Sequence, residues 1–427
     1  MAASTTGGAP SGAWRRVPAV LVLIGVPLAL VGGLASCVAS ETGHLPGDSM
    51  ERVWDTPYDR TAAGYGNAAW ALGDTVVRSR FDAVTAFDAG TGERRWEYAV
   101  PGRAEICATG NAADSVVLVG LTEGKGCATV AAIDLEDGRE LWRTGRRPGS
   151  AAPKDGSGSD TVAAGAGLAV VLDEDERRDE EPAEGARPVI PGDQALRAFD
   201  LRTGAPRWKA AVPEGCLPRR VAVAPQQVLA VLGCGTEAKL AAFDPADGRE
   251  RWTVPLDARR PVAADSFTSF LSAEPTVLKV QEPVGHGVHA YFAFGQDGRR
   301  QGKIDVTGDE AAVADGKLFA AGHGVVAYDL VSGDEVWSSD SLGTWRGVTG
   351  MHAGGGRVTV FTRSRKGLDE LYVYDSATGG TVDERTFSRD TDDGNAELAG
   401  LFRHDDLLIA VRWGDGSRRP FSAYRTW

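Results

Sequence analysis

Short segments in which apolar and polar residues alternate occur along most of the chain. Two of them follow one another at Thr75–Arg80 and Ala83–Asp88, and two more at Lys317–Ala321 and Val325–Asp329. An alternation with a period of two is typical of strands that bury one face. Helical periodicity is not convincing anywhere outside the N-terminal apolar segment. The pattern predicts an all-β protein built from many short strands.

One motif recurs along the chain, and it is the strongest signal in the sequence. It places an aromatic residue or Ile directly before an Asp, a Gly four residues after the Asp, and a Trp four residues after the Gly. Chance would rarely produce even one such match in a chain of this composition. The complete copies are Asp88, Gly92 and Trp96; Asp134, Gly138 and Trp142; Asp200, Gly204 and Trp208; Asp244, Gly248 and Trp252; and Asp329, Gly333 and Trp337.

Three incomplete copies extend the series. The copy at Asp375 keeps the turn, but Asp383 stands where the Trp is expected; the copy at 293–295 has lost both the Asp and the Trp; and the copy at 423–425 has no room for a turn. The copies are spaced about 35 to 65 residues apart, which is the size of a four-stranded propeller blade. We predict an eight-bladed β-propeller with antiparallel blades, or a seven-bladed one if the unit at 293–295 is not a full blade.

Each residue of the motif has a physical role. The Asp oxygen can accept a backbone N–H two residues on and so begin a tight turn. The Gly supplies the positive φ that closes the turn. The Trp lies on the strand that follows and has a large face to bury against a neighbouring blade. We therefore expect the repeated residues to join blades to one another.

The two ends of the repeat region predict how the ring closes. The last blade has three predicted strands, among them 406–413 and 421–427, and no room for a fourth. Met50–Trp54 resembles a lone outer strand that carries its Trp. We predict that this N-terminal strand completes the last blade and removes the exposed sheet edges. The propeller would then span residues 50–427, after a linker at residues 38–49.

Residues 1–37 are predicted to direct export and not to belong to the fold. Arg15 and Arg16 precede an apolar run at 17–34, and the run ends in Leu34-Ala35-Ser36-Cys37. This sequence resembles the lipobox of bacterial lipoproteins, which makes Cys37 the candidate lipidation site. The alternative is an uncleaved transmembrane helix over 17–36. Both place the body of the protein on the outer face of the cytoplasmic membrane.

The other four cysteines form two near pairs, Cys107 with Cys127 and Cys216 with Cys234. An oxidising compartment would allow both pairs to form disulfides, and four buried free thiols are the alternative.

Charge and the remaining polar residues narrow the range of functions. The net charge of −13, with scattered basic residues, argues against a nucleic-acid partner. The acidic segment 173–181 is interpreted as a solvated loop, or else as a contact for a cation or a basic partner. Residues 390–397 lack the ligand alternation of a calcium loop. No ligand spacing connects the later histidines, so we predict no metal site and no catalytic residue. These histidines are His286, His289, His323, His352 and His404.

The repeated unit resembles the tryptophan-docking repeat of quinoprotein-like (PQQ-repeat) propellers. That family includes pyrroloquinoline-quinone alcohol dehydrogenases and the propeller lipoprotein of the outer-membrane barrel-assembly machinery. The dehydrogenases hold their quinone with a disulfide between adjacent cysteines, and no two cysteines are adjacent here. The resemblance therefore implies the fold and no cofactor. The Arg-, Ala- and Gly-rich composition favours an actinobacterial type of lipoprotein, for which no such machinery is expected.

Together these features predict a non-catalytic, membrane-anchored, extracytoplasmic propeller that binds or scaffolds an unknown protein or cell-envelope polymer. The alternative is a cofactor- or metal-dependent propeller enzyme. Three or more His, Asp, Glu or Asn side chains converging at the mouth of the central channel would favour the enzyme.

Overall fold

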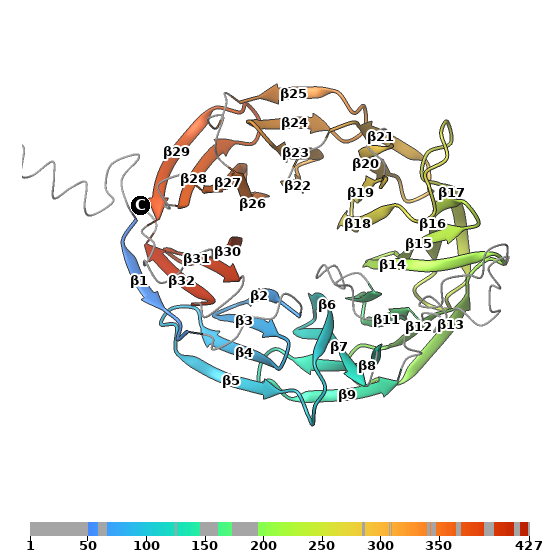
Figure 1. Cartoon of the computed structure of the whole chain (residues 1–427), viewed down its shortest axis with the longest axis horizontal. Coiled ribbons are helices and arrows are strands. Elements are labelled where there is room, and N and C mark those ends of the chain that lie inside the picture. The colour runs from blue at the N-terminus through green and yellow to red at the C-terminus, as the bar shows by residue number, and fades with distance from the viewer. Residues whose placement is uncertain are drawn as a thin grey trace, which may run out of the picture.

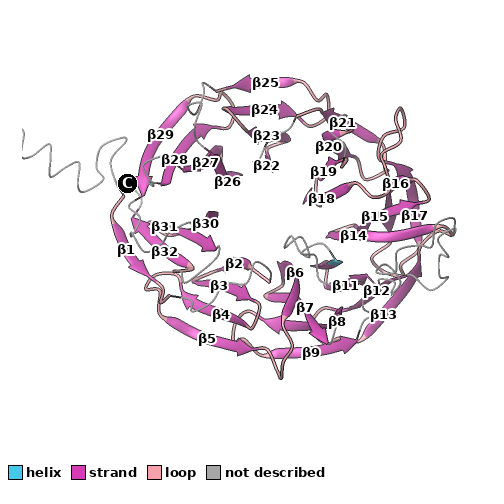
Figure 2. Ribbon diagram, in the orientation of Figure 1, coloured by secondary structure: helices cyan, strands magenta, loops and turns pink. Residues whose placement is uncertain are grey.

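The computed structural model describes residues 50–58, 66–123, 126–145, 161–172, 195–283, 287–306, 308, 310–339, 342, 347–363, 369–387, 397–413 and 419–425. Within these ranges, 32 strands form eight four-stranded antiparallel sheets. The sheets stand as blades around a common axis, with the first strand of each blade at the centre and the last at the rim (Figure 1). Strands and loops make up almost all of the drawn chain (Figure 2). No helix able to span a membrane occurs in the described ranges.

Seven blades consist of four consecutive strands each. Blade 1 contains β2 (Ala68–Leu72), β3 (Thr75–Arg80), β4 (Ala83–Asp88) and β5 (Arg94–Ala99), and blade 2 contains β6 (Ile106–Ala113), β7 (Val116–Glu123), β8 (Gly126–Asp134) and β9 (Glu140–Gly145). Blade 3 contains β10 (Val162–Gly165), β11 (Leu168–Leu172), β12 (Ala195–Asp200) and β13 (Pro206–Ala211), and blade 4 contains β14 (Cys216–Ala224), β15 (Gln227–Cys234), β16 (Glu237–Phe243) and β17 (Glu250–Pro255). Blade 5 contains β18 (Phe267–Ser272), β19 (Thr276–Gln281), β20 (His289–Phe294) and β21 (Arg300–Ile304). Blade 6 contains β22 (Glu310–Ala314), β23 (Lys317–Ala321), β24 (Val325–Asp329) and β25 (Glu335–Ser338), and blade 7 contains β26 (Gly347–Gly354), β27 (Arg357–Arg363), β28 (Asp369–Asp375) and β29 (Thr381–Phe387).

Blade 8 joins the two ends of the repeat region. Its strands are β30 (Glu397–His404), β31 (Leu407–Trp413), β32 (Phe421–Arg425) and β1 (Arg52–Asp55). The backbone N–H of Arg425 donates to the carbonyl of Glu51 at 2.9 Å. The prediction of eight blades closed by an N-terminal strand is confirmed, and the degenerate unit at 293–295 belongs to a full blade.

The middle strands are apolar on both faces because each blade is covered by two neighbours. In β15, Val228 and Ala230 pack towards blade 3, whereas Leu229 and Val231 pack towards blade 5. A separate cluster of buried side chains fills each of the eight junctions between blades. Alternation along a strand therefore divides its side chains between two interfaces, and both interfaces are apolar and closely packed.

The antiparallel order gives the ring two different faces. Connections from the first to the second strand, and from the third to the fourth, lie on one face, which we call the short-turn face. Several connections from the first strand to the second are two-residue hairpins with positive φ, such as Asp114-Ser115 and Asp315-Gly316. The opposite face, the long-connection face, is where the second strand leads to the third and one blade leads to the next. Residues 146–161 and 173–194 join strand ends on this face.

Candidate functional site

The repeated Asp and Gly form the turn between the third and fourth strands of a blade. In blade 4 a side-chain oxygen of Asp244 accepts the backbone N–H of Ala246 at 2.8 Å, two residues on. The carbonyl of Asp244 accepts the N–H of Gly248, also at 2.8 Å. Gly248 has a φ of +73°, which L side chains rarely adopt. The local sequence therefore determines this turn before any packing is considered.

The repeated Trp lies against the turn of the following blade. A Cβ at Gly248 would stand 2.6 Å from Cε3 of Trp208, so the indole covers the glycine in contact with its backbone. The indole N–H of Trp208 donates to the carbonyl of Pro245 in the same turn at 2.8 Å. The same bond joins Trp142 to Leu201, Trp252 to Gln296 and Trp337 to Ser376. In β1, Trp54 covers Gly92 of blade 1.

Among the residues that the structure describes, none places an indole at the junction between blades 5 and 6, and the glycines there explain why. Register places Gly302 of β21 at the position that Trp96 holds in blade 1. A Cβ at Gly302 would collide with the carbonyl oxygen of Leu330 in the turn of blade 6, and one at Gly333 would stand 2.8 Å from the carbonyl oxygen of Lys303. Backbone packs directly on backbone here, so no side chain fits at either position.

An arginine that the sequence motif did not include neutralises three of the turn aspartates. It stands seven residues after the Asp, on the fourth strand, and pairs back across the hairpin. The pairs are Asp88 with Arg95 at 2.6 Å, Asp200 with Arg207 at 2.5 Å and Asp244 with Arg251 at 2.7 Å. The regular spacing was the signal in the sequence that could have revealed these pairs.

Hydrogen bonds to the charged form lower the pKa of these aspartates. For Asp200, the Arg207 guanidinium is the largest cause, followed by the hydroxyl and N–H of Thr203, and the pKa falls from 3.8 to about 2. The pKa of Asp88 and that of Asp244 are lowered too, first by Arg95 and by Arg251 respectively. These carboxylates stay ionised and paired at all physiological pH values.

We expect Asp200→Asn to lower the melting temperature at pH 6 and to have no effect near pH 2. A carboxylate whose folded pKa is depressed contributes stability above its unfolded pKa, and this contribution is lost as the pH falls from about 4 to about 2. Melting temperatures of both proteins measured across this range test the expectation. Arg207→Gln should behave similarly, because it removes the same ion pair. A difference that stays constant from pH 6 to pH 2 would contradict the assignment.

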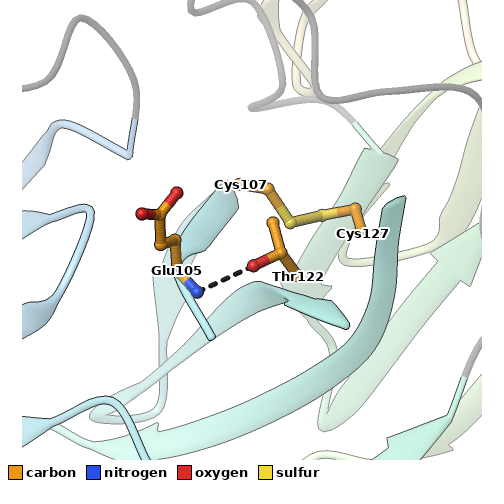
Figure 3. The surroundings of a disulfide bond; sticks show 4 residues. All are labelled: Glu105, Cys107, Thr122 and Cys127. Carbon is orange, nitrogen blue, oxygen red and sulfur yellow. Dashed lines mark hydrogen bonds between the residues drawn. A yellow bond between two sulfur atoms is a disulfide. The ribbon is translucent and has the colours of Figure 1, made fainter. Parts of the chain in front are cut away.

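Both predicted disulfides are present, Cys107–Cys127 and Cys216–Cys234. Each lies at the strand ends of the long-connection face. Figure 3 shows the first one, next to the hydrogen bond from the N–H of Glu105 to the hydroxyl of Thr122 at 2.8 Å. It links the first strand of blade 2 to the third and passes over Gly120 of β7, where a Cβ would stand 2.7 Å from the Sγ of Cys127. The disulfides are consistent with an oxidising, extracytoplasmic compartment.

Gly120→Val should prevent the Cys107–Cys127 bond from closing, because its side chain would occupy the position of the sulfur atom. The stability in urea should fall by about 3 kcal/mol, the contribution expected from closing a loop of this length. Mass spectrometry of alkylated peptides would identify which cysteines are free. The Cys216–Cys234 bond in the same molecule is the internal control and should remain closed. A closed Cys107–Cys127 bond in the variant would refute the steric argument.

The channel end of the blades contains a cavity of about 530 Å³, lined by residues of the first strands of blades 1 to 5 and the residues beside them. Its polar lining side chains are Asn67, Thr109, Asn111 and Ser272, and none of its described lining residues has an ionisable side chain. The amide of Asn111 is used to join blades: it donates to the carbonyl of Ala164 at 2.7 Å and accepts the N–H of the same residue at 3.0 Å. This cavity offers hydrogen bonds and apolar contact to a ligand.

The remaining candidates lie apart from one another. His289 lies in β20, His352 in β26 and His404 in β30, while His323 follows β23. Over the described ranges, no three His, Cys, Asp or Glu side chains stand close enough to hold a metal ion. Cys37, His286, the acidic segment 173–181 and residues 390–396 fall outside the described residues.

A PQQ-repeat family model described as outer membrane protein assembly factor BamB matches residues 43–180 and 172–310, which is more than half of the chain. The crystal structure of BamB from Moraxella catarrhalis is similar over 87% of this chain and 97% of that chain, at 16% identity and a TM-score of 0.51. The computationally designed Ika8 protein is similar over 88% and 99%, at 14% identity and a TM-score of 0.57. At such identities the two structures support the fold alone. A search of curated proteins found no match. The chain belongs to the PQQ-repeat β-propeller family of outer membrane protein assembly factor BamB.

Proposed function

We propose that this protein is a non-catalytic scaffold of the cell envelope, anchored to the membrane through Cys37, that binds a protein or envelope polymer on its long-connection face. The main support for the proposal is that the residues that stand out in the sequence or line the central cavity have structural roles. The turn aspartates and glycines, the indoles and the amide of Asn111 are all engaged in turns or in contacts between blades.

The family supports a scaffold, because it is the family of an outer membrane protein assembly factor. The position of the long connections supports the choice of face. The acidic segment 173–181 belongs to the connection between β11 and β12, two strand ends of the long-connection face. The two disulfides brace strand ends on the same side. A rigid platform with variable connections is the usual arrangement of a binding surface.

The test is recovery of a partner from intact envelopes after cross-linking. We expect the wild-type chain to fractionate with membranes and to retain one reproducible partner. Cys37→Ser should release the chain from the membrane. Replacing residues 173–194 by a short Gly-Ser linker should remove the partner without changing the melting temperature.

A matched control changes the opposite face. Replacing Asp114-Ser115 by Asn-Gly keeps a two-residue hairpin with positive φ on the short-turn face, and the partner should be retained. Equal recovery with all variants would contradict the proposed surface. A quinone or metal recovered in stoichiometric amount would contradict the non-catalytic role and favour the enzyme.

A further inference from the structure

A second cavity, of about 310 Å³, opens on the short-turn face between blades 4 and 5. Gln226 and Gln227 line it from blade 4, and Glu274, Gln296 and Gln301 line it from blade 5. Ala, Pro and Phe residues form much of the remaining wall, and no lysine or arginine is among the described lining residues. The cavity thus combines amide groups with one carboxylate and no cation.

The register of the strands shows why the cavity is there. The second and third strands align the two blades: Thr276 pairs with Phe294 in blade 5, and Val76 pairs with Phe87 in blade 1. The third and fourth strands align in the same way: Phe292 pairs with Lys303 in blade 5, and Thr85 pairs with Glu97 in blade 1. The equivalent positions in blades 5 and 1 are therefore Glu274 and Asp74, Gly295 and Asp88, and Gln301 and Arg95. Blade 5 keeps the acid of the first turn but lacks the arginine and the second acid.

In blade 1 a guanidinium occupies the space between these two turns. Arg95 donates to both carboxylate oxygens of Asp74, at 2.8 and 2.7 Å, and to Asp88 at 2.6 Å. It also donates to the hydroxyl of Thr75 at 2.7 Å. The guanidinium binding holds the pKa of Asp74 at about 2. The position is therefore built to receive a planar cation with several donors.

Blade 2 shows that the arginine need not come from the same blade. Leu141 stands at the position of the arginine there, seven residues after Asp134. Arg202 of blade 3 reaches across instead and donates to the carboxylate of Asp134 at 2.7 Å and to the carbonyl of Asp114 at 3.0 Å. A guanidinium from outside the blade can thus bridge the same pair of turns.

Blade 5 has neither kind of arginine. Among the described residues, Glu274 accepts a side-chain hydrogen bond from Gln296 alone, at 3.3 Å. The carboxylate of Glu274 therefore has no cationic partner among the described residues. A guanidinium has five N–H donors and no acceptor, so it would pair with this carboxylate and keep donors for the exposed amide oxygens of the cavity wall.

We propose that this cavity binds the guanidinium group of an arginine side chain presented by a partner protein. The bound arginine would take the place that Arg95 takes in blade 1 and Arg202 takes in blade 2. The proposal rests on the proposed function only for the source of the arginine, which is a protein partner. It adds a contact on the face opposite to the long connections.

The test uses N-acetyl-arginine amide as the probe, titrated into the full chain and followed by calorimetry and by tryptophan fluorescence. Trp252 is a suitable reporter because its indole donates to the carbonyl of Gln296, a residue of the cavity. We expect binding at least tenfold tighter than that of N-acetyl-citrulline amide, which has the same shape without the charge. Glu274→Gln should weaken binding by about tenfold or more, because it removes a charge-assisted hydrogen bond.

Gln301→Arg is the decisive variant, since it restores the residue found in blade 1 and fills the cavity with the chain's own guanidinium. It should abolish binding of the probe. Glu237→Gln on the long-connection face is the control and should leave binding unchanged. Residues 274 and 301 are exposed, so the melting temperature should not change with either substitution. No binding, equal binding of citrulline, or full binding by Gln301→Arg would overturn the proposal. Because the probe is a small molecule, such failure concerns this cavity alone, whereas failure to recover a partner from envelopes concerns the proposed function.

Discussion

Gly248→Ala is expected to lower the free energy of unfolding by about 3 kcal/mol or more, although it adds a single methyl group. Two effects combine at this position. The φ of +73° strains any L residue by about 1–2 kcal/mol. The new Cβ would also stand 2.6 Å from the indole of Trp208, which must then move away from its turn and lose part of the contact worth about 3–5 kcal/mol in a Trp→Ala change. Urea denaturation would measure the loss.

Gly235→Ala separates these two effects. Gly235 has a φ of +60° in the same blade, and nothing lies within 4 Å of the Cβ that it would acquire. This control should lower the free energy of unfolding by about 1–2 kcal/mol, the backbone strain alone. If both variants lose the same amount, the indole contact contributes nothing and the role of the repeated Trp in joining blades is refuted.

Deletion of residues 50–58 should lower the free energy of unfolding by at least about 5 kcal/mol and cause aggregation. The deletion removes Met50 and Trp54, which are 4% and 9% exposed, and each large apolar side chain lost from a core lowers stability by about 2–5 kcal/mol. It also leaves β32 as an open edge, available for pairing with other chains. Urea denaturation and light scattering after size-exclusion chromatography would measure the two effects.

The matched control deletes residues 41–49, which are equal in number and directly precede the strand. This variant should elute at the same volume as the wild type and be as stable. Normal stability after deletion of 50–58 would show that ring closure by β1 does not stabilise the fold.

The architecture could be predicted because the motif repeats at the spacing of a blade. Asp88 and its equivalents indicate a turn, and the glycine four residues later permits the positive φ that the turn requires. The spacing to the next copy of the motif gives the number of strands between two turns. The spare strand near Trp54 and the short last unit were sufficient to predict closure. These features depend on residues close together in the sequence, so the sequence pattern was enough to predict them.

The contacts that the sequence did not reveal depend on neighbours distant along the chain. Arg202 pairs with Asp134 because blades 2 and 3 lie side by side, and no regular spacing in the sequence indicates this ion pair. The sequence shows only that the Trp is lost at Gly302, whereas the structure shows that a Cβ there would collide with the carbonyl oxygen of Leu330. The two cavities are likewise made by residues of different blades. Pairing of the cysteines was predictable from proximity, but the bridge over Gly120 required the register of β7.

The direction of β1 determines how the ring would stand on a bilayer. Glu51 lies beside Arg425, where a turn of the short-turn face would be, and β1 then runs towards the opposite face. A lipid on Cys37, as proposed, would be joined to this face by a tether of residues 38–49, which can reach at most about 40 Å when fully extended. The short-turn face, with the cavity proposed to bind an arginine side chain, would then lie nearest the lipid headgroups. The long connections would point away from the headgroups into the surrounding compartment.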